Sequence, residues 1–112
     1  MNADAQIDLA RDMEGYLMDP EEWDETVACR LATSEGTELD DAYWPMLRFM
    51  REFWAEHRIA PDVRHVVDFL VKEQGFEKKR AKEHVFKLFP YGYVKQACKI
   101  AGMRKPRVWS TG

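Results

Sequence analysis

The sequence contains few of the residues that hold small proteins together covalently or through metals. Only Cys29 and Cys98 among its 112 residues are cysteines, too few for a disulfide framework. Its three histidines stand apart from both cysteines, so no zinc-ligand spacing occurs, and we expect no metal or other cofactor. No apolar run approaches the roughly 18 residues that a membrane span requires, and the acidic N-terminus does not resemble a signal peptide. These absences predict a cytoplasmic protein with reduced thiols and no membrane contact.

The residues that are present suffice for one modest hydrophobic core. Hydrophobic residues make up 46% of the chain and aromatic residues 12%, proportions typical of a folded globular protein. Neither an internal repeat nor a low-complexity linker divides the sequence. We therefore predict a single domain over residues 1–112, with a globular core at 1–102 and a C-terminal arm at 103–112.

Charge is distributed unevenly along the chain, although the net charge is only −3. Residues 1–76 contain 7 lysines and arginines against 18 acidic residues, whereas residues 77–112 contain 10 against 2. Such a division can steer an anionic partner toward one end of the molecule. It can equally bring the basic end of the chain against the acidic end within one fold, and the sequence leaves both interpretations open.

Apolar spacing predicts a mainly α-helical domain. Apolar positions three and four apart repeat in five segments, residues 20–34, 41–57, 61–74, 77–88 and 91–101. Asp19 and Asp40 are expected to cap the first two helices, and Pro45 to bend the second slightly. Cys29 lies off the apolar stripe of its helix and is expected to be a partly packed, inert thiol. Residues 1–18 show a weaker alternation that predicts a short N-terminal β-hairpin.

The third and fourth predicted helices, joined at Gly75, have the proportions of a helix-turn-helix. The second helix of the pair is basic, as helices that read DNA often are. The residues that could contact DNA are Lys78, Lys79 and Lys82. Against this interpretation, basic and acidic residues alternate at i, i+4 spacing, as on a solvated helix face, and no evident set of Asn, Gln and Ser side chains could read base edges. DNA binding is therefore the alternative hypothesis.

The stretch from Leu88 to Trp109 contains the one cysteine whose position suggests reactivity. At about 100° per residue, apolar residues fall on one side of Cys98, whereas Lys95 and Lys99 fall on the other. The thiol is therefore predicted to lie at the boundary between an apolar and a cationic face. The two lysines would favour the thiolate, but the negative end of the helix dipole would disfavour it, so the sequence leaves the direction open.

These residues resemble the C-terminal region of the DsrC/TusE family of small sulfur-relay proteins. The resemblance rests on Leu88-Phe89-Pro90-Tyr91-Gly92, on Lys95 to Gly102 and on Lys105-Pro106, and it extends back through Ile59-Ala60-Pro61, Leu39, Trp44 and Gly15-Tyr16-Leu17. It thus covers nearly the whole chain. The resemblance implies a small helical fold with a short N-terminal hairpin, a helix-turn-helix-like portion and a flexible C-terminal arm. It also implies a sulfite reductase-type enzyme or a sulfurtransferase as the partner.

The resemblance also implies what the arm does. In the family, a cysteine next to the last residue accepts sulfur as a persulfide or couples it to a partner. In DsrC, a second cysteine eleven residues earlier can close a disulfide with it. Cys98 matches the earlier cysteine, but eleven residues later this sequence has Trp109. It also has Tyr93 and Arg104 where the family usually has proline, and it runs three residues past Trp109.

The resulting hypothesis is a sulfur-relay protein that lacks the usual sulfur-accepting cysteine and works by docking to its partner. Trp109 is expected to anchor the arm, since tryptophan is a favoured anchor at interfaces. Cys98 is the one catalytic candidate, as a transient persulfide carrier, and no self-contained catalytic site is evident. The basic residues expected to contact the partner are Arg64, Lys95, Lys99, Arg104, Lys105 and Arg107.

Two alternatives remain open at this stage. One is a transcriptional regulator that binds DNA through residues 61–88. The other is a cysteine-depleted protein that competes with a true sulfur carrier for the same enzyme.

Overall fold

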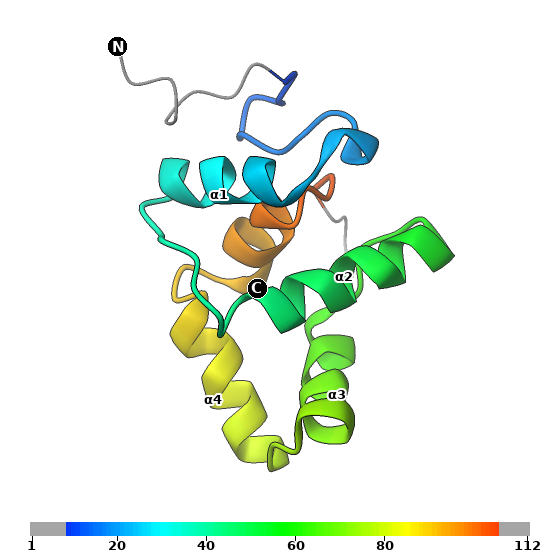
Figure 1. The fold of residues 1–112 in the computed structure, drawn as a ribbon, viewed down its shortest axis with the longest axis vertical. Helices are drawn as coiled ribbons and strands as arrows, with labels where there is room; N and C mark the ends of the chain where they lie inside the picture. Colours follow the sequence, from blue (N-terminus) through cyan, green and yellow to red (C-terminus); the bar gives the residue numbers. More distant parts are fainter. Residues whose placement is uncertain (1–8, 106–112) are drawn as a thin grey trace.

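The computed structural model describes residues 9–105. In chain order its elements are the 3₁₀ turn η2 (Pro20–Glu22), α1 (Glu25–Ser34), α2 (Trp44–His57), α3 (Val63–Gln74), α4 (Lys78–Leu88) and the π-helical turn η3 (Tyr93–Cys98). Figure 1 shows α3 and α4 side by side at one end, α1 at the other end, and the orange C-terminal segment between α1 and α2. The mainly α-helical prediction is confirmed. None of the described helices is long and apolar enough to cross a membrane.

The predicted N-terminal β-hairpin is wrong. No strand forms in the described part of the chain; instead, Arg11 and Leu17 make one isolated antiparallel bridge. The carboxylate of Asp12 closes the turn between them by accepting hydrogen bonds from the backbone N–H groups two and four residues later. Backbone N–H groups of Asp12 and Met18 also donate to the carbonyls of Tyr16 and Ala10, over 2.8 and 3.0 Å. Residues 10–18 therefore form a tight loop with a single bridge and no extended strands. Residues 1–8, the rest of that prediction, lie outside the described residues.

The first predicted helix is split into two elements. Asp19 caps the short turn η2, as expected, and accepts a hydrogen bond from the backbone N–H of Glu21. Trp23 is then extended, and the carboxylate of Asp24 accepts from the backbone N–H of Val27 and starts α1. An aspartate with this geometry creates a new helix N-terminus, which the apolar spacing alone did not reveal.

The second helix, α2, begins three residues later than predicted, at Trp44. Asp40 accepts a hydrogen bond from the backbone N–H of Ala42 and so caps a turn that precedes the helix. Pro45 consequently lies in the first turn of α2, where a backbone N–H has no intrahelical partner to lose. The reason for the predicted bend at Pro45 is thereby removed.

The helix pair α3 and α4 matches the predicted bounds closely. Asp62 caps α3 in a reciprocal capping box with His65, and Gly75 ends it in the left-handed conformation with φ 76°. The buried residues of the pair are Val66, Val67, Leu70, Ala81 and Val85. Each large apolar side chain buried in this way contributes about 1.5–3 kcal/mol.

The centre of the core lies where α2 meets the C-terminal segment. Met46, Leu47 and Met50 of α2 are fully buried. Tyr43 packs edge to face on Phe89, with ring centroids 5.4 Å apart. The residues that follow Phe89 continue into this core rather than over its surface, so the fold places the C-terminal segment inside the domain as far as Met103.

Candidate functional site at the C-terminal segment

The C-terminal segment enters the core as a single wide helical turn. Five of the six residues of η3 are buried, and Lys95 is the exception. Gln96, the one buried polar residue among residues 9–105, accepts a 2.7 Å hydrogen bond from the backbone N–H of Tyr91 through Oε1. Tyr16 donates a hydrogen bond from its hydroxyl to the carbonyl of Val94 over 2.9 Å. These contacts fix the segment on both sides.

Cys98 lies inside the core, with an exposed fraction of 0%. The predicted boundary position of this thiol is therefore wrong. Burial raises the pKa of the Cys98 thiol to about 12, because the thiolate loses its water, and a hydrogen bond with Tyr93 offsets only part of the rise. The same burial raises the pKa of Tyr93 well above its ordinary value. At neutral pH Cys98 is thus a protonated, enclosed thiol, the opposite of the accessible thiolate that nucleophilic chemistry requires.

Gly102 ends the segment in a double hydrogen-bonded C-cap. The backbone N–H of Met103 bonds to the carbonyl of Cys98, and the N–H of Gly102 to that of Lys99, each over 3.0 Å. The φ of Gly102 is 74°, and a Cβ at this position would lie 2.3 Å from Cδ1 of Trp23. Two features therefore require glycine at position 102: the left-handed φ and the close approach of the Trp23 ring.

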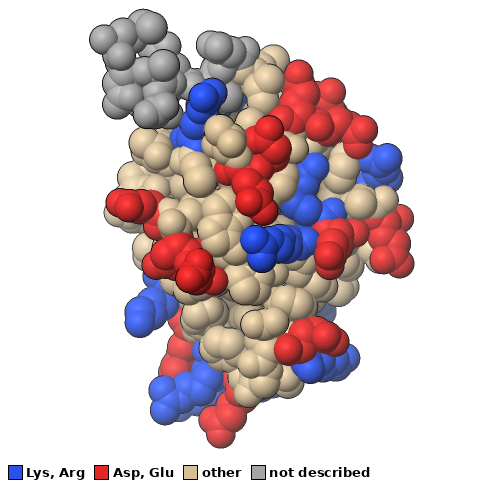
Figure 2. Space-filling view, viewed as in Figure 1, with Lys and Arg blue, Asp and Glu red and all other residues tan. Residues whose placement is uncertain are grey.

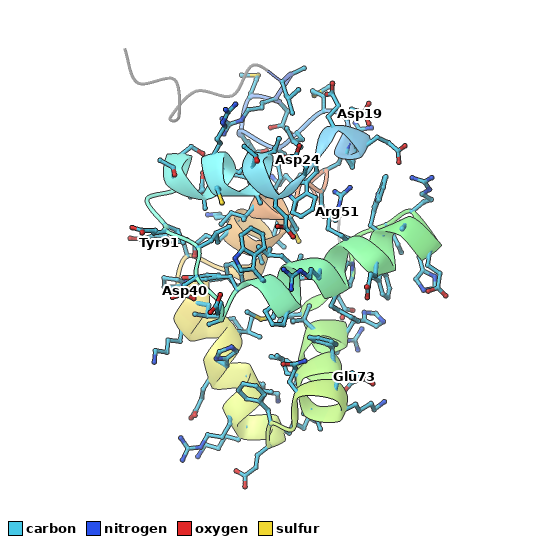
Figure 3. All side chains as sticks on the ribbon, in the orientation of Figure 1. Asp19, Asp24, Asp40, Arg51, Glu73 and Tyr91 are labelled. Carbon is cyan, nitrogen blue, oxygen red and sulfur yellow. The ribbon has the colours of Figure 1, made fainter. Side chains whose placement is uncertain are left out.

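Trp23 and Arg51 fix the end of the C-terminal segment through the carbonyls of Ile100 and Ala101. Nε1 of Trp23 donates to the carbonyl of Ile100 over 2.9 Å. The Arg51 guanidinium donates to the carbonyl of Ala101 over 3.0 Å and to that of Pro20 over 2.7 Å. It also lies over the Trp23 ring at 4.7 Å and over the Trp54 ring at 4.9 Å. Figure 3 shows Arg51 reaching from α2 toward the N-terminal segments.

These anchors escaped the sequence analysis, although one of them left a signal. Arg51 falls four residues after Leu47 and three before Trp54, on the apolar stripe of α2. An arginine on such a stripe, next to a tryptophan, indicates a buried guanidinium that bonds to backbone carbonyls. Trp23 offered no comparable signal, because its partner Ile100 is distant in sequence.

Two of the predicted partner-binding cations of the C-terminal segment pair with carboxylates of the same chain. The Lys99 ammonium pairs with Glu35 at 3.2 Å, and only 12% of the Lys99 side chain is exposed. Lys105 pairs with Glu14 at 3.0 Å. Lys95 and Arg104 are exposed. The two pairs join the basic end of the chain to its acidic end, and Figure 2 shows basic and acidic groups interleaved over the visible face.

The remaining predicted residues fall on α3 and α4 or outside the described residues. Arg64 is exposed, with 87% of its side chain accessible, and pairs with Asp62 at 2.9 Å. Lys78, Lys79 and Lys82 are exposed on α4. Arg107 and Trp109 lie outside residues 9–105. The structure thus brings Arg64, Lys78 and Lys82 together around one groove, and it separates them from Cys98.

Cys29, expected to be partly packed, is the exposed cysteine. It lies on the outer side of α1, and Thr33 donates a hydrogen bond to its backbone carbonyl. The sequence position off the apolar stripe correctly placed Cys29 away from the core. Cys29 is therefore more accessible than expected, and Cys98 is less accessible.

The geometry defines a small helical protein that fixes the root of its C-terminal segment in the core. Within residues 9–105 no group of three or more His, Cys, Asp or Glu side chains could hold a metal ion. A family model described as DsrC like protein matches residues 4–108. The chain belongs to this family.

Characterised relatives fall in two groups. The Sulfurtransferase TusE of Pectobacterium atrosepticum is 42% identical over 98 residues, which cover 88% of this chain and 89% of that protein. The Sulfurtransferase TusE of Salmonella paratyphi A is 39% identical over 99 residues, covering 88% and 90%. The oxidized gamma-subunit of the dissimilatory sulfite reductase, DsrC, from Archaeoglobus fulgidus superposes with a TM-score of 0.78 at 37% identity, covering 89% of this chain and 90% of that one.

Proposed function

We propose that the protein works in sulfur relay by docking to a sulfite reductase-type enzyme or a sulfurtransferase, without carrying sulfur on Cys98. The family membership supports the sulfur-relay part of this proposal, because its relatives are named TusE sulfurtransferases and DsrC gamma-subunits. The DNA-binding alternative receives no support from these relatives. We place the protein in the cytoplasm, in keeping with the sequence prediction.

The enclosure of Cys98 is the observation that carries the docking part of the proposal. A persulfide carrier must present its sulfur to a donor and then to an acceptor, so its thiol has to be accessible and at least partly ionised. The Cys98 sulfur is buried, and its pKa is raised to about 12 by that burial. Position 109, where the family pattern calls for the mobile cysteine, holds tryptophan.

We assign the contact with the partner to the residues that follow the buried segment, which ends at Met103. Met103 is buried, and Arg104 and Lys105 are exposed, so the described chain leaves the core after Met103. We take the arm to be residues 103–112, as the sequence predicts. Its expected contacts are Arg104, Lys105 and Arg107 as cations and Trp109 as the apolar anchor. Lys95 adds an exposed cation on η3, whereas the pairing of Lys99 with Glu35 leaves it little to offer a partner.

A sulfur-loading experiment tests whether Cys98 can act as a sulfur carrier. The Cys29→Ser variant, which retains only the buried thiol, is treated with polysulfide in native buffer and in denaturant, and its intact mass is measured. We expect a gain of one sulfur only in denaturant. A stable gain in native buffer that is absent from the Cys29→Ser/Cys98→Ser double variant would establish Cys98 as a carrier and contradict the proposal.

A competition experiment tests the docking itself. A TusE or DsrC protein with its C-terminal cysteine is bound to its partner enzyme, and this chain is added at increasing concentration. We expect displacement, and we expect the Trp109→Ala variant to displace about tenfold less well, as for a central interface residue. Replacement of Arg80 by Ala, far from the arm in sequence and exposed on α4, is the matched surface control. No displacement at any concentration would remove the docking function.

A further inference from the structure

We propose that the groove between α3 and α4 binds an acidic, amphipathic segment of a partner protein. The proposal rests on the docking function above and adds a second contact surface to it, away from the arm. The groove has a volume of about 510 Å³ and is lined by Val63, Arg64, Val67, Asp68, Lys78, Lys82 and Phe86.

The floor of the groove is apolar and open to solvent. Val63 and Val67 come from α3, and Phe86 faces them from α4. The exposed fraction of Phe86 is 52%, which is high for a phenylalanine next to two valines. An exposed aromatic side chain beside an apolar depression marks a site where another molecule can remove apolar surface from water. A segment with an apolar stripe would cover it.

The rim of the groove is predominantly cationic. Arg64, Lys78 and Lys82 surround the floor, against the single acidic side chain of Asp68. Arg64 is already paired with Asp62, but neither lysine has an acidic partner within 4 Å among residues 9–105. Complementary charge therefore favours a partner with acidic residues on each side of its apolar stripe.

The surroundings favour a peptide over a DNA duplex. On the other side of α3 lies a second hollow, of about 460 Å³, whose lining includes three carboxylates, Glu52, Asp68 and Glu73, against one lysine, Lys72. Asp68 belongs to both hollows, so acidic groups begin at the edge of the cationic groove. A duplex covers a wide surface and would bring its phosphates against these carboxylates, whereas a single amphipathic helix laid along α3 and α4 would contact a narrower strip of this surface. Figure 1 shows α3 and α4 side by side, as a helix-binding groove requires.

Synthetic peptides provide the test. The probe is a fluorescent peptide with Leu at positions i, i+3, i+4 and i+7 and Glu elsewhere, and the reference is a scrambled peptide of the same composition. We expect the full chain to bind the amphipathic peptide about tenfold more tightly than the scrambled one, measured by fluorescence anisotropy. The Phe86→Ala variant should weaken binding about tenfold, and Phe86→Leu should restore most of it.

Two double variants of equal charge separate groove binding from general attraction. Lys78→Ala/Lys82→Ala removes two cations of the rim, whereas Lys79→Ala/Lys87→Ala removes two cations of the same helix that do not line the groove. We expect the first pair to weaken peptide binding about tenfold and the second less than twofold at equal salt. Circular dichroism establishes that all variants remain folded.

Three outcomes would overturn the proposal. Equal loss in the two double variants would leave only non-specific charge attraction. Equal binding of the two peptides would remove the need for an apolar stripe. Tighter binding to a DNA duplex, unaffected by Phe86→Ala, would assign the surface to nucleic acid. The competition experiment with the arm remains independent, because a protein that fails here and still displaces a sulfur carrier retains the docking function.

Discussion

The two cysteines of the protein lie in opposite environments. Cys29 is exposed on α1, and Cys98 is sealed in the core by η3 and its neighbours. Cys98 is the cysteine that matches the family motif, yet the exposed thiol is Cys29. The comparison teaches that position in a motif does not decide reactivity, because access and ionisation are set by distant residues.

The largest expected effect on stability comes from replacing Gly102. In Gly102→Ala the new Cβ would collide with Trp23, and the alanine would have to adopt a left-handed φ. We expect a loss of about 3 kcal/mol in the free energy of unfolding, measured in urea. Gly75→Ala is the matched control, since its φ is 76° but nothing lies within 4 Å of the added Cβ. That variant should lose only about 1 kcal/mol, and equal losses would show that the Trp23 contact is unimportant.

Removing the Arg51 anchor should have the next largest effect. Lysine at position 51 keeps the charge but lacks the planar guanidinium. It therefore cannot donate to the carbonyls of both Pro20 and Ala101 while lying over the two tryptophan rings. We expect Arg51→Lys to lower the free energy of unfolding by about 2 kcal/mol. Arg48→Lys, on the same helix with 60% of its side chain exposed, should change it by less than about 0.5 kcal/mol. If the two variants behave alike, the Arg51 contacts do not anchor the arm.

The pH dependence of stability offers a smaller effect with a defined sign. The folded pKa of Cys98 is raised from its ordinary value of 9.0 to about 12 by burial. The buried, protonated thiol therefore contributes fully to the free energy of unfolding below pH 9. This contribution is lost as the pH rises toward 12, because the unfolded chain releases the proton first. We expect the slope of stability against pH in this window to be shallower in Cys98→Ala by at most about 1.4 kcal/mol per pH unit.

Tyr16 and Tyr93 contribute to the same alkaline loss, because burial raises their pKa values as well. Cys29→Ala is therefore the necessary control, measured by the same urea titrations. That variant removes the exposed thiol and leaves Cys98 and both tyrosines in place. A Cys98→Ala slope identical to those of Cys29→Ala and the unmodified protein would mean that the thiol ionises freely in the folded state.

Local signals explain which parts of the fold could be predicted. The bounds of α3 and α4 follow from apolar spacing, a capping aspartate and Gly75, all of which act within a few residues. The family resemblance, read from the motif around Cys98, was confirmed over residues 4–108. The predicted N-terminal hairpin is reduced to one bridge, in a short loop that the Asp12 carboxylate and backbone hydrogen bonds close together.

The environment of Cys98 could not be predicted for two physical reasons. The predicted side-chain directions assume an α-helix, with about 100° of rotation per residue. Tyr93–Cys98 instead forms a π-helical turn, which is wider and shifts these directions. In addition, Lys99 turns away from the thiol toward Glu35, a partner distant in sequence. Periodicity carries no information on either point.

Thiol labelling of the native protein tests the central claim most directly. The chain is mixed with an excess of a thiol-reactive disulfide reagent at neutral pH, and labelled peptides are followed over time by mass spectrometry. The account predicts that Cys29 reacts at the rate of a free thiol and that Cys98 reacts on the order of 10³-fold more slowly, through local or global opening. Reaction of Cys98 at a rate comparable to that of Cys29 would contradict it and restore Cys98 as a sulfur carrier.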